Sequence, residues 1–133
     1  MVRDMHENGR AEHHGAAFYR TASGTEPVRE FLERLPPRYR DALRRQIHHA
    51  CLILDATGFD PAFPRTSHVR GPIRELRCHF GRTLYRILYG RSGRLLILLH
   101  VFEKRRRTIA PADIDCAIAR WLDFEQRSRT EES

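Results

Sequence analysis

The sequence predicts a small α+β protein in which helices pack on a short antiparallel sheet. Three observations favour this class. Apolar residues recur at helical spacing in the first half of the chain and again near its end, whereas residues 73–102 form alternating or continuous apolar runs between glycine turns. The 133 residues suffice for one domain with its own core. We expect the order β-α-α-β-β-β-α: an antiparallel meander, two N-terminal helices packed on one face, and a C-terminal helix.

The N-terminal segment contributes one strand and one helix. Residues 1–16 lack periodicity and are expected to form a flexible tail, and residues 17–21 fit a short first strand. Thr25 is the expected N-cap of the first helix, in which Pro27 occupies the first turn without losing a hydrogen bond. The helix carries one apolar stripe and ends at Pro36.

A second amphipathic helix is expected over residues 38–56. Its apolar side chains recur on one face, and Gly58 ends it, as glycine commonly does. Residues 59–72 contain three prolines and are interpreted as an irregular connection.

The next part of the chain has the pattern of a meander. Residues 73–80 alternate in part, and residues 83–89 are rich in strand formers. Gly81-Arg82 and the segment 90–93 are expected to form the two hairpin turns. Residues 94–102 form a nearly continuous apolar run, which predicts a strand buried on both faces.

A last helix is expected to begin at Pro111. Asp113 and Asp115 favour the positive N-terminal end of this helix. Residues 126–133 are expected to form a C-terminal tail, so that the domain spans residues 17–125. The side chains expected to face inward are Ile114, Ala117, Ile118, Trp121 and Leu122.

Positive charge is concentrated in one stretch. The net charge is +7, but residues 65–107 hold twelve arginines and lysines against two acids, whereas the remainder of the chain has a net charge of −3. A basic block on a balanced background favours a polyanionic partner, because neutralised phosphates release counterions. Codon usage can explain arginine in place of lysine. It does not explain why acidic residues avoid this stretch, so we expect contact with nucleic acid.

Several other classes are disfavoured. No apolar run approaches a membrane span, no secretory signal pattern is present, and the basic block lacks an amphipathic helical pattern for binding a membrane surface. Three widely spaced cysteines argue against a disulfide framework and fit a cytoplasmic protein.

Metal and cofactor chemistry also find little support. The pairs His13-His14 and His48-His49 do not chelate alone, and no cysteine or carboxylate cluster accompanies them. Cys78 and His79 are strand neighbours that point to opposite faces. Phosphate-binding glycine motifs are absent, so no cofactor is expected.

Basic side chains on adjacent strands are the remaining candidates for chemistry. RNA supplies its own nucleophile, the 2′-OH, so arginine, lysine and histidine alone suffice to stabilise the transition state and move a proton. Arg86 lies within a strand core, where an arginine is costly unless it is used. Its alternative role is a structural salt bridge with Glu75. The candidates are Arg77, Arg86, His100, Lys104 and Arg105.

Four segments resemble the phage-derived Gp49-like proteins, which belong with the HigB-type toxins in the RelE/ParE toxin superfamily. The resemblance covers roughly residues 17–125. The segments are Glu26–Leu32, Arg74–Arg77, Tyr85–Tyr89 and Leu98–Lys104.

The resemblance implies a RelE/ParE-like fold and the toxin of a type II toxin–antitoxin system. Such a toxin enters the ribosomal A site and cleaves mRNA without a metal. A helix-turn-helix, HigA-like antitoxin restrains it, and operator DNA is contacted only through that antitoxin.

The resemblance also implies roles for individual residues. Arg86 matches the central-strand arginine that contacts the scissile phosphate, and Arg77 matches a basic residue on the first meander strand. Lys104 and Arg105 match the basic pair that ends the last strand, the second of which acts in catalysis. His100 is a candidate for proton transfer. Further RNA contacts are expected from Arg74, Arg82, Arg106 and Arg107.

The sequence departs from the family pattern in two places. RelE has lysines on the first meander strand, where this chain has Ile73 and Glu75, and a base-stacking tyrosine after the basic pair, which is absent before Pro111. Close Gp49-like relatives read Lys-Lys-Thr-x-Lys-Thr-Pro, whereas residues 104–111 are one residue longer. Two alternatives therefore stay open: a ParE-like gyrase inhibitor without enzymatic activity, and a catalytically degenerate module that binds nucleic acid or an antitoxin.

Overall fold

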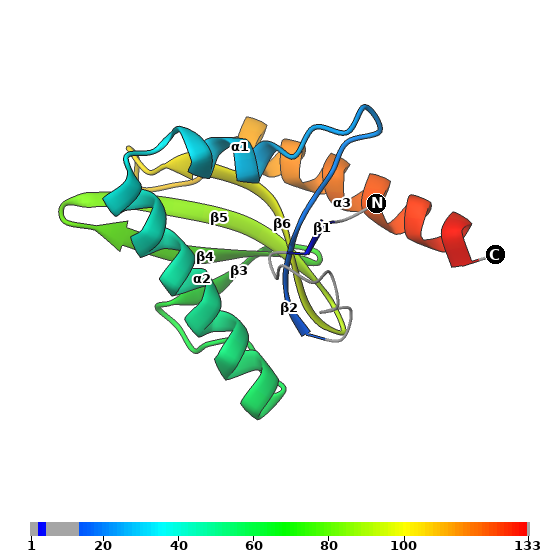
Figure 1. The fold of residues 1–133 in the computed structure, drawn as a ribbon, viewed down its shortest axis with the longest axis horizontal. Helices are drawn as coiled ribbons and strands as arrows, with labels where there is room; N and C mark the ends of the chain where they lie inside the picture. The colour runs from blue at the N-terminus through cyan, green and yellow to red at the C-terminus, as the bar shows by residue number, and fades with distance from the viewer. Residues whose placement is uncertain (1–2, 5–13, 133) are drawn as a thin grey trace.

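The structure is a computed structural model that describes residues 3–4 and 14–132. It confirms the α+β class, and it adds two short strands to the predicted order, one near the N-terminus and one directly after the second helix (Figure 1). The helices are α1 (Pro27–Arg34), α2 (Pro37–Thr57) and α3 (Pro111–Glu132). The strands are β1 (Arg3–Asp4), β2 (His14–Phe18), β3 (Thr66–Arg70), β4 (Ile73–Phe80), β5 (Thr83–Ser92) and β6 (Arg94–Glu103).

The described strands form one mixed sheet in the order β1-β2-β6-β5-β4-β3. The meander β3-β4-β5-β6 is antiparallel throughout, as predicted for its last three strands. β2 pairs with β6 in parallel, which makes the sheet mixed rather than purely antiparallel. Parallel strands need a crossover connection, and the chain between β2 and β6, which contains both N-terminal helices and the first three meander strands, provides it.

The helices cover the two faces of the sheet unequally. α1 and α2 lie on one face, where side chains such as Leu32, Leu43 and Ile47 form the larger core with the strands. α3 lies on the other face, where Ala117 and Trp121 contribute to a smaller core. None of the described helices is long and apolar enough to cross a membrane.

β6 is buried on both faces, as its continuous apolar run predicts. Leu96 and Leu98 belong to the core under α1 and α2, whereas Ile97 and Leu99 belong to the core under α3. Each of these four side chains is at most 1% exposed.

The segment 59–72, expected to be irregular, contains the edge strand β3. The prolines that argued against a strand flank β3 and do not interrupt it. Only Thr66 of this strand is buried, so the apolar periodicity that signals a strand is missing.

Several predicted boundaries were wrong by a few residues. β2 precedes the expected segment 17–21 by three residues, and the N-cap of α1 is Glu26 rather than Thr25. The second hairpin turn centres on Gly93 alone, because Gly90 lies within β5. The ends of α2, by contrast, lie within one residue of the prediction, and Gly58 ends the helix in the left-handed conformation, with φ of +79°.

The expected tails are also described in part. α3 continues to Glu132, so residues 126–132 are helical, and Leu122 is 58% exposed rather than inward-facing. Of the expected N-terminal tail, Arg3–Asp4 and residues 14–16 lie in strands, and the other residues are outside the described part of the chain.

Candidate functional site

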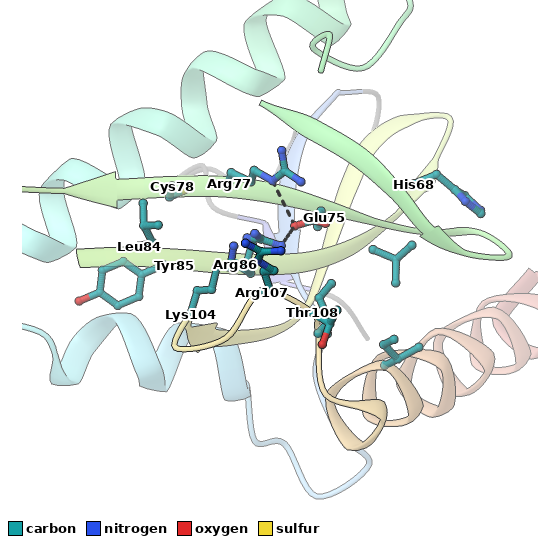
Figure 2. A pocket seen from close by; sticks show the side chains of 13 residues that line it. His68, Glu75, Arg77, Cys78, Leu84, Tyr85, Arg86, Lys104, Arg107 and Thr108 are labelled. Carbon is teal, nitrogen blue, oxygen red and sulfur yellow. Dashed lines mark hydrogen bonds and ion pairs between the residues drawn. The ribbon is translucent and has the colours of Figure 1, made fainter. Parts of the chain in front are cut away.

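A pocket of about 650 Å³ lies on the sheet face that α3 only partly covers. Trp121 packs against β5 at Gly90, where an added Cβ would come within 2.4 Å of the indole ring. Among the described helices, only α3 contributes to the lining of this pocket, through Ile114. The pocket is lined chiefly by polar side chains, among them Glu75, Arg77, Arg86, Lys104, Arg107 and Thr108 (Figure 2).

The register of β4 and β5 brings two arginines together. Arg77 is the direct partner of Arg86, and opposite residues on paired strands point to the same face. Arg86 is only 7% exposed. Two adjacent arginines, one of them buried, require a compensating negative charge.

Glu75 supplies that negative charge. One of its oxygens, Oε1, accepts a hydrogen bond from Nη1 of Arg86 and lies 3.5 Å from Nε of Arg77. The other oxygen, Oε2, accepts a hydrogen bond from Ser67 on β3 at 3.1 Å. The salt bridge considered as the alternative role of Arg86 is therefore present, and it orients the arginine within the pocket (Figure 2).

Arg77 is held from a second side. Its Nη1 donates a hydrogen bond to the carbonyl of Pro64 at 3.0 Å, whereas its buried Nε has no hydrogen-bond acceptor among the described atoms, since the contact with Glu75 is an ion pair only. The guanidinium of Arg77 is thus fixed by the backbone but keeps an unused donor.

A β-bulge in β6 aims the end of that strand at the pocket. The pairing passes from Tyr89–Leu98 to Leu88–His100, so Leu99 is an extra residue. Phe102 consequently pairs with Arg86 and faces the pocket side. Without the extra residue, the alternation would place Lys104 on the face covered by α1 and α2.

Lys104 and Arg107 complete the cationic lining. The backbone N–H of Lys104 donates a hydrogen bond to the carbonyl of Leu84 at 2.8 Å. This bond extends the β5–β6 ladder and fixes the backbone position of Lys104 beside the pocket. Neither side chain has an ion-pair partner in the described part of the chain. The pocket therefore holds four cations, Arg77, Arg86, Lys104 and Arg107, against the single carboxylate of Glu75.

His100 lies outside this pocket. Its Nε2 is 2.7 Å from Oδ1 of Asp113, and its Nδ1 is 3.9 Å from Sγ of Cys116, so its contacts are with the first turns of α3. The sequence placed His100 on the correct strand. It could not show that α3 begins over this residue.

The other predicted basic residues are dispersed. Arg105 is a largely exposed side chain 3.6 Å from Glu103, and with Arg106 it lines a smaller cavity of about 120 Å³ at the start of α3, which shares Lys104 and Thr108 with the first pocket. Arg74 lies on the opposite sheet face, where it forms an ion pair with Asp60 at 2.9 Å. Arg82 is exposed in the β4–β5 turn.

The pocket contains no activated nucleophile. Burial raises the pKa of the Cys78 thiol to about 12, so this cysteine stays protonated near neutral pH. Burial likewise raises the pKa of the Tyr85 hydroxyl. Among the described residues, no three histidine, cysteine, aspartate or glutamate side chains are grouped so that they could hold a metal ion.

Sequence reasoning missed the contribution of β3 to the site. His68 and Val69 line the pocket, and Ser67 hydrogen-bonds to Glu75. In Figure 2 the ring of His68 lies away from the arginines, at the other end of the pocket. The sequence of Thr66–Arg70 gives little indication of a strand, and the prolines on both sides of this segment favoured an irregular connection instead.

The fold and the site define a small α+β protein with a cationic pocket on a partly open sheet face. The sequence matches the model of the family described as phage derived protein Gp49-like (DUF891) over residues 30–122. The chain therefore belongs to the Gp49-like family, and the matched segment includes the whole meander and the first half of α3. None of the curated proteins compared with the chain matches it.

Proposed function

We propose that the protein is the toxin of a type II toxin–antitoxin system and cleaves mRNA on the ribosome without a metal. The observation that carries this proposal is the pocket in which Arg86, Arg77, Lys104 and Arg107 converge on one space. A phosphodiester is the polyanion whose reaction such a pocket can accelerate, because negative charge grows on the phosphate oxygens in the transition state.

The proposed reaction is an internal transesterification. The 2′-oxygen of one nucleotide attacks the adjacent phosphorus and gives its proton to a base on the protein, and the bond to the 5′-oxygen of the next nucleotide breaks as that oxygen takes a proton from water. The products are a 2′,3′-cyclic phosphate and a 5′-hydroxyl. Arg86 and Lys104 would bind the non-bridging oxygens of the pentacovalent phosphorane.

Glu75 is the carboxylate available to accept the 2′ proton. Its Oε1 is occupied by Arg86 in the free protein. A phosphate that draws the Arg86 guanidinium toward itself would release this oxygen beside the reacting ribose. His100 is hydrogen-bonded to Asp113 away from the pocket, so we do not assign it a role in proton transfer.

The proposal includes the partners that the family resemblance implies. A helix-turn-helix antitoxin would neutralise the toxin, and the ribosome would present the mRNA. Contact with operator DNA would be made by the antitoxin. We propose the cytoplasm as the place of action, since that is where translation occurs.

The test is inducible expression of wild type, Arg86→Lys and Lys104→Ala in bacteria, with mapping of new mRNA 5′ ends. Lysine keeps the charge at position 86 but loses the two-pronged donor geometry. Lys104 has no ion-pair partner in the described structure, so its removal leaves the fold intact. We expect growth arrest and new 5′ ends within translated codons for wild type, and loss of both for each variant.

Three results would contradict the proposal. Growth arrest without new mRNA ends would favour gyrase inhibition, which a DNA-damage response would reveal. Absence of any arrest would favour a module that binds without catalysis. Full arrest by both folded variants would remove the pocket from the mechanism, whatever the target.

A further inference from the structure

A second cavity, of about 630 Å³, lies beside the first, between α2 and β4. Arg77 lines both cavities, so they meet at one guanidinium. Arg45, His49, Arg65 and His79 also line the second cavity, and no carboxylate does so. The cationic surface therefore continues beyond the site proposed for cleavage.

Two of these cations are not compensated by acids. Arg65 contacts Nδ1 of His49, which carries no negative charge, and Arg45 has no ion-pair partner among the residues described. Both arginines are exposed. Arg77, by contrast, shares Glu75 with Arg86. The second cavity is thus ready to accept a negative group without breaking an existing ion pair.

The backbone edge in this cavity is already closed. β3 pairs with β4 only as far as Leu76, and beyond this point Gln46 of α2 bonds to both backbone groups of His79, at 3.0 and 2.7 Å. An added peptide strand would need these groups free. The cavity therefore recognises its occupant through side chains, which disfavours a protein segment added to the sheet.

An exposed aromatic ring lies next to the shared arginine. The guanidinium carbon of Arg77 is 5.2 Å from the ring centroid of Phe63, and Phe63 is 73% exposed. The neighbouring residues Pro64 and Arg65 line the second cavity. An exposed aromatic beside a cationic groove is the arrangement with which proteins stack the bases of single strands.

We infer that the second cavity binds the nucleotide adjacent to the cleavage site on the same single-stranded RNA. Arg45 and Arg65 contact its phosphate, and Phe63 stacks on its base. This inference rests on the proposed function, because the cleavage site in the first pocket defines which nucleotide is adjacent. Binding of the RNA itself requires neither cleavage nor the ribosome. It assigns a role to residues outside the first pocket.

The test is RNA binding by the purified protein without ribosomes. The probe is a fluorescein-labelled eight-nucleotide 2′-O-methyl RNA, which lacks the nucleophile and stays intact. Fluorescence anisotropy at several salt concentrations gives the affinity and its salt dependence for Arg45→Ala/Arg65→Ala and for Phe63→Ala. The matched control is Arg34→Ala/Arg94→Ala, which removes the same charge from exposed positions outside both cavities.

We expect the Arg45→Ala/Arg65→Ala variant to bind about tenfold more weakly, with a slope of log affinity against log salt lower by roughly 0.7 for each lost phosphate contact. Phe63→Ala should lose at least about fivefold with an unchanged slope, because stacking releases no counterions. The control should change affinity by less than about twofold.

Two results would overturn the inference. In one, the Arg45→Ala/Arg65→Ala variant behaves like the control. In the other, an RNA duplex or an octaglutamate peptide binds as tightly as the single strand and Phe63→Ala has no effect, which would reduce the cavity to a general anion surface. Because neither readout involves cleavage, wild-type binding with these losses would stand even if Arg86 proved irrelevant to toxicity.

Discussion

The two halves of the sheet face that carries α3 differ in chemistry, although each contains a buried β5 side chain. Leu88 and Arg86 are neighbours on the same side of β5, with exposures of 0% and 7%. Leu88 packs in the apolar core beneath α3, whereas Arg86 is covered by polar groups and paired with Glu75. The comparison teaches that a buried side chain does not by itself indicate an apolar core. One half of this face is covered by α3, whereas in the other half Arg86 is covered by the polar side chains around it.

The boundary between the halves depends on two local features. Gly90 allows the indole of Trp121 to lie directly on β5, which anchors α3 over one half. The segment between β6 and α3 then passes the other half, and Arg107 and Thr108 reach the pocket from it. The open half is therefore a consequence of where α3 can dock.

The largest expected change in unfolding free energy comes from breaking the buried ion pair. Arg86→Met leaves the carboxylate of Glu75 buried with only the more distant Arg77, and removing one partner of a buried pair costs about 3–5 kcal/mol. The measurement is urea denaturation followed by circular dichroism.

A double variant sharpens this test by making the open half resemble the apolar half. Glu75→Leu/Arg86→Met should recover stability to within about 1–2 kcal/mol of wild type, because apolar residues of similar volume can replace a buried pair. It should cause no growth arrest. Arrest by this stable variant would show that the pair serves only the fold.

The second largest expected loss of stability comes from disturbing the contact between α3 and β5 in the covered half of the face. In Gly90→Ala, the new Cβ would lie 2.4 Å from the indole of Trp121, and such overpacking costs about 1–3 kcal/mol. Thermal unfolding measures the loss. The added cost should disappear when Trp121→Leu is the background, since the obstructing ring is gone. An equal cost in both backgrounds would mean that the strand, not the helix contact, is disturbed.

The third effect is smaller and depends on pH. The hydrogen bond from Tyr19 at 2.6 Å, together with Arg127, lowers the pKa of Asp123 on α3. A carboxyl with a lowered folded-state pKa stabilises the protein above its unfolded pKa, and this stabilisation is lost as pH falls through the folded pKa. Because Asp123 is partly exposed, Asp123→Asn should cost only about 0.5–1 kcal/mol at pH 7.

The cost of Asp123→Asn should be smaller at pH 2 than at pH 7, because the stabilisation by the charge is lost as pH falls through the lowered pKa of Asp123. Asparagine can still accept the hydrogen bond from Tyr19, so the difference reports the charge. A cost that persists unchanged at pH 2 would assign the effect to packing. Unfolding curves at the two pH values distinguish these results.

The sequence predicted the covered half better than the open half for a physical reason. Apolar periodicity located β4, β6 and the start of α3, because burial against a helix leaves a regular pattern. The pocket depends on the register that pairs Arg77 with Arg86 and on the bulge at Leu99, which no short-range pattern specifies. Of the predicted catalytic residues, Arg77, Arg86 and Lys104 line the pocket, together with Arg107, which was expected only as a further RNA contact, whereas His100 and Arg105 do not line it.

The residues that sequence reasoning did not place show the same limit. His100 was grouped with the arginines because it lies on a neighbouring strand, but its side chain contacts the start of α3. β3 was missed because an edge strand with one buried residue lacks alternation. Arg45 comes near Arg77 only because α2 packs beside β4, whereas Phe63 comes near it because the chain before β3 runs alongside β4, with which β3 pairs.

The substitution expected to change stability least, Lys104→Ala, distinguishes best between a residue needed for function and one needed for the fold. Lys104→Ala removes a side chain without an ion-pair partner in the described part of the chain, so the unfolding free energy should change by less than about 0.5 kcal/mol. Growth arrest should nevertheless be lost, because the lysine is one of four cations facing the pocket. Lys104→Arg is the matched control and should retain arrest, since the charge stays at the same position. Arrest by a fully stable Lys104→Ala protein would confine the active surface to the arginines fixed by Glu75, and the end of β6 would then serve the fold alone.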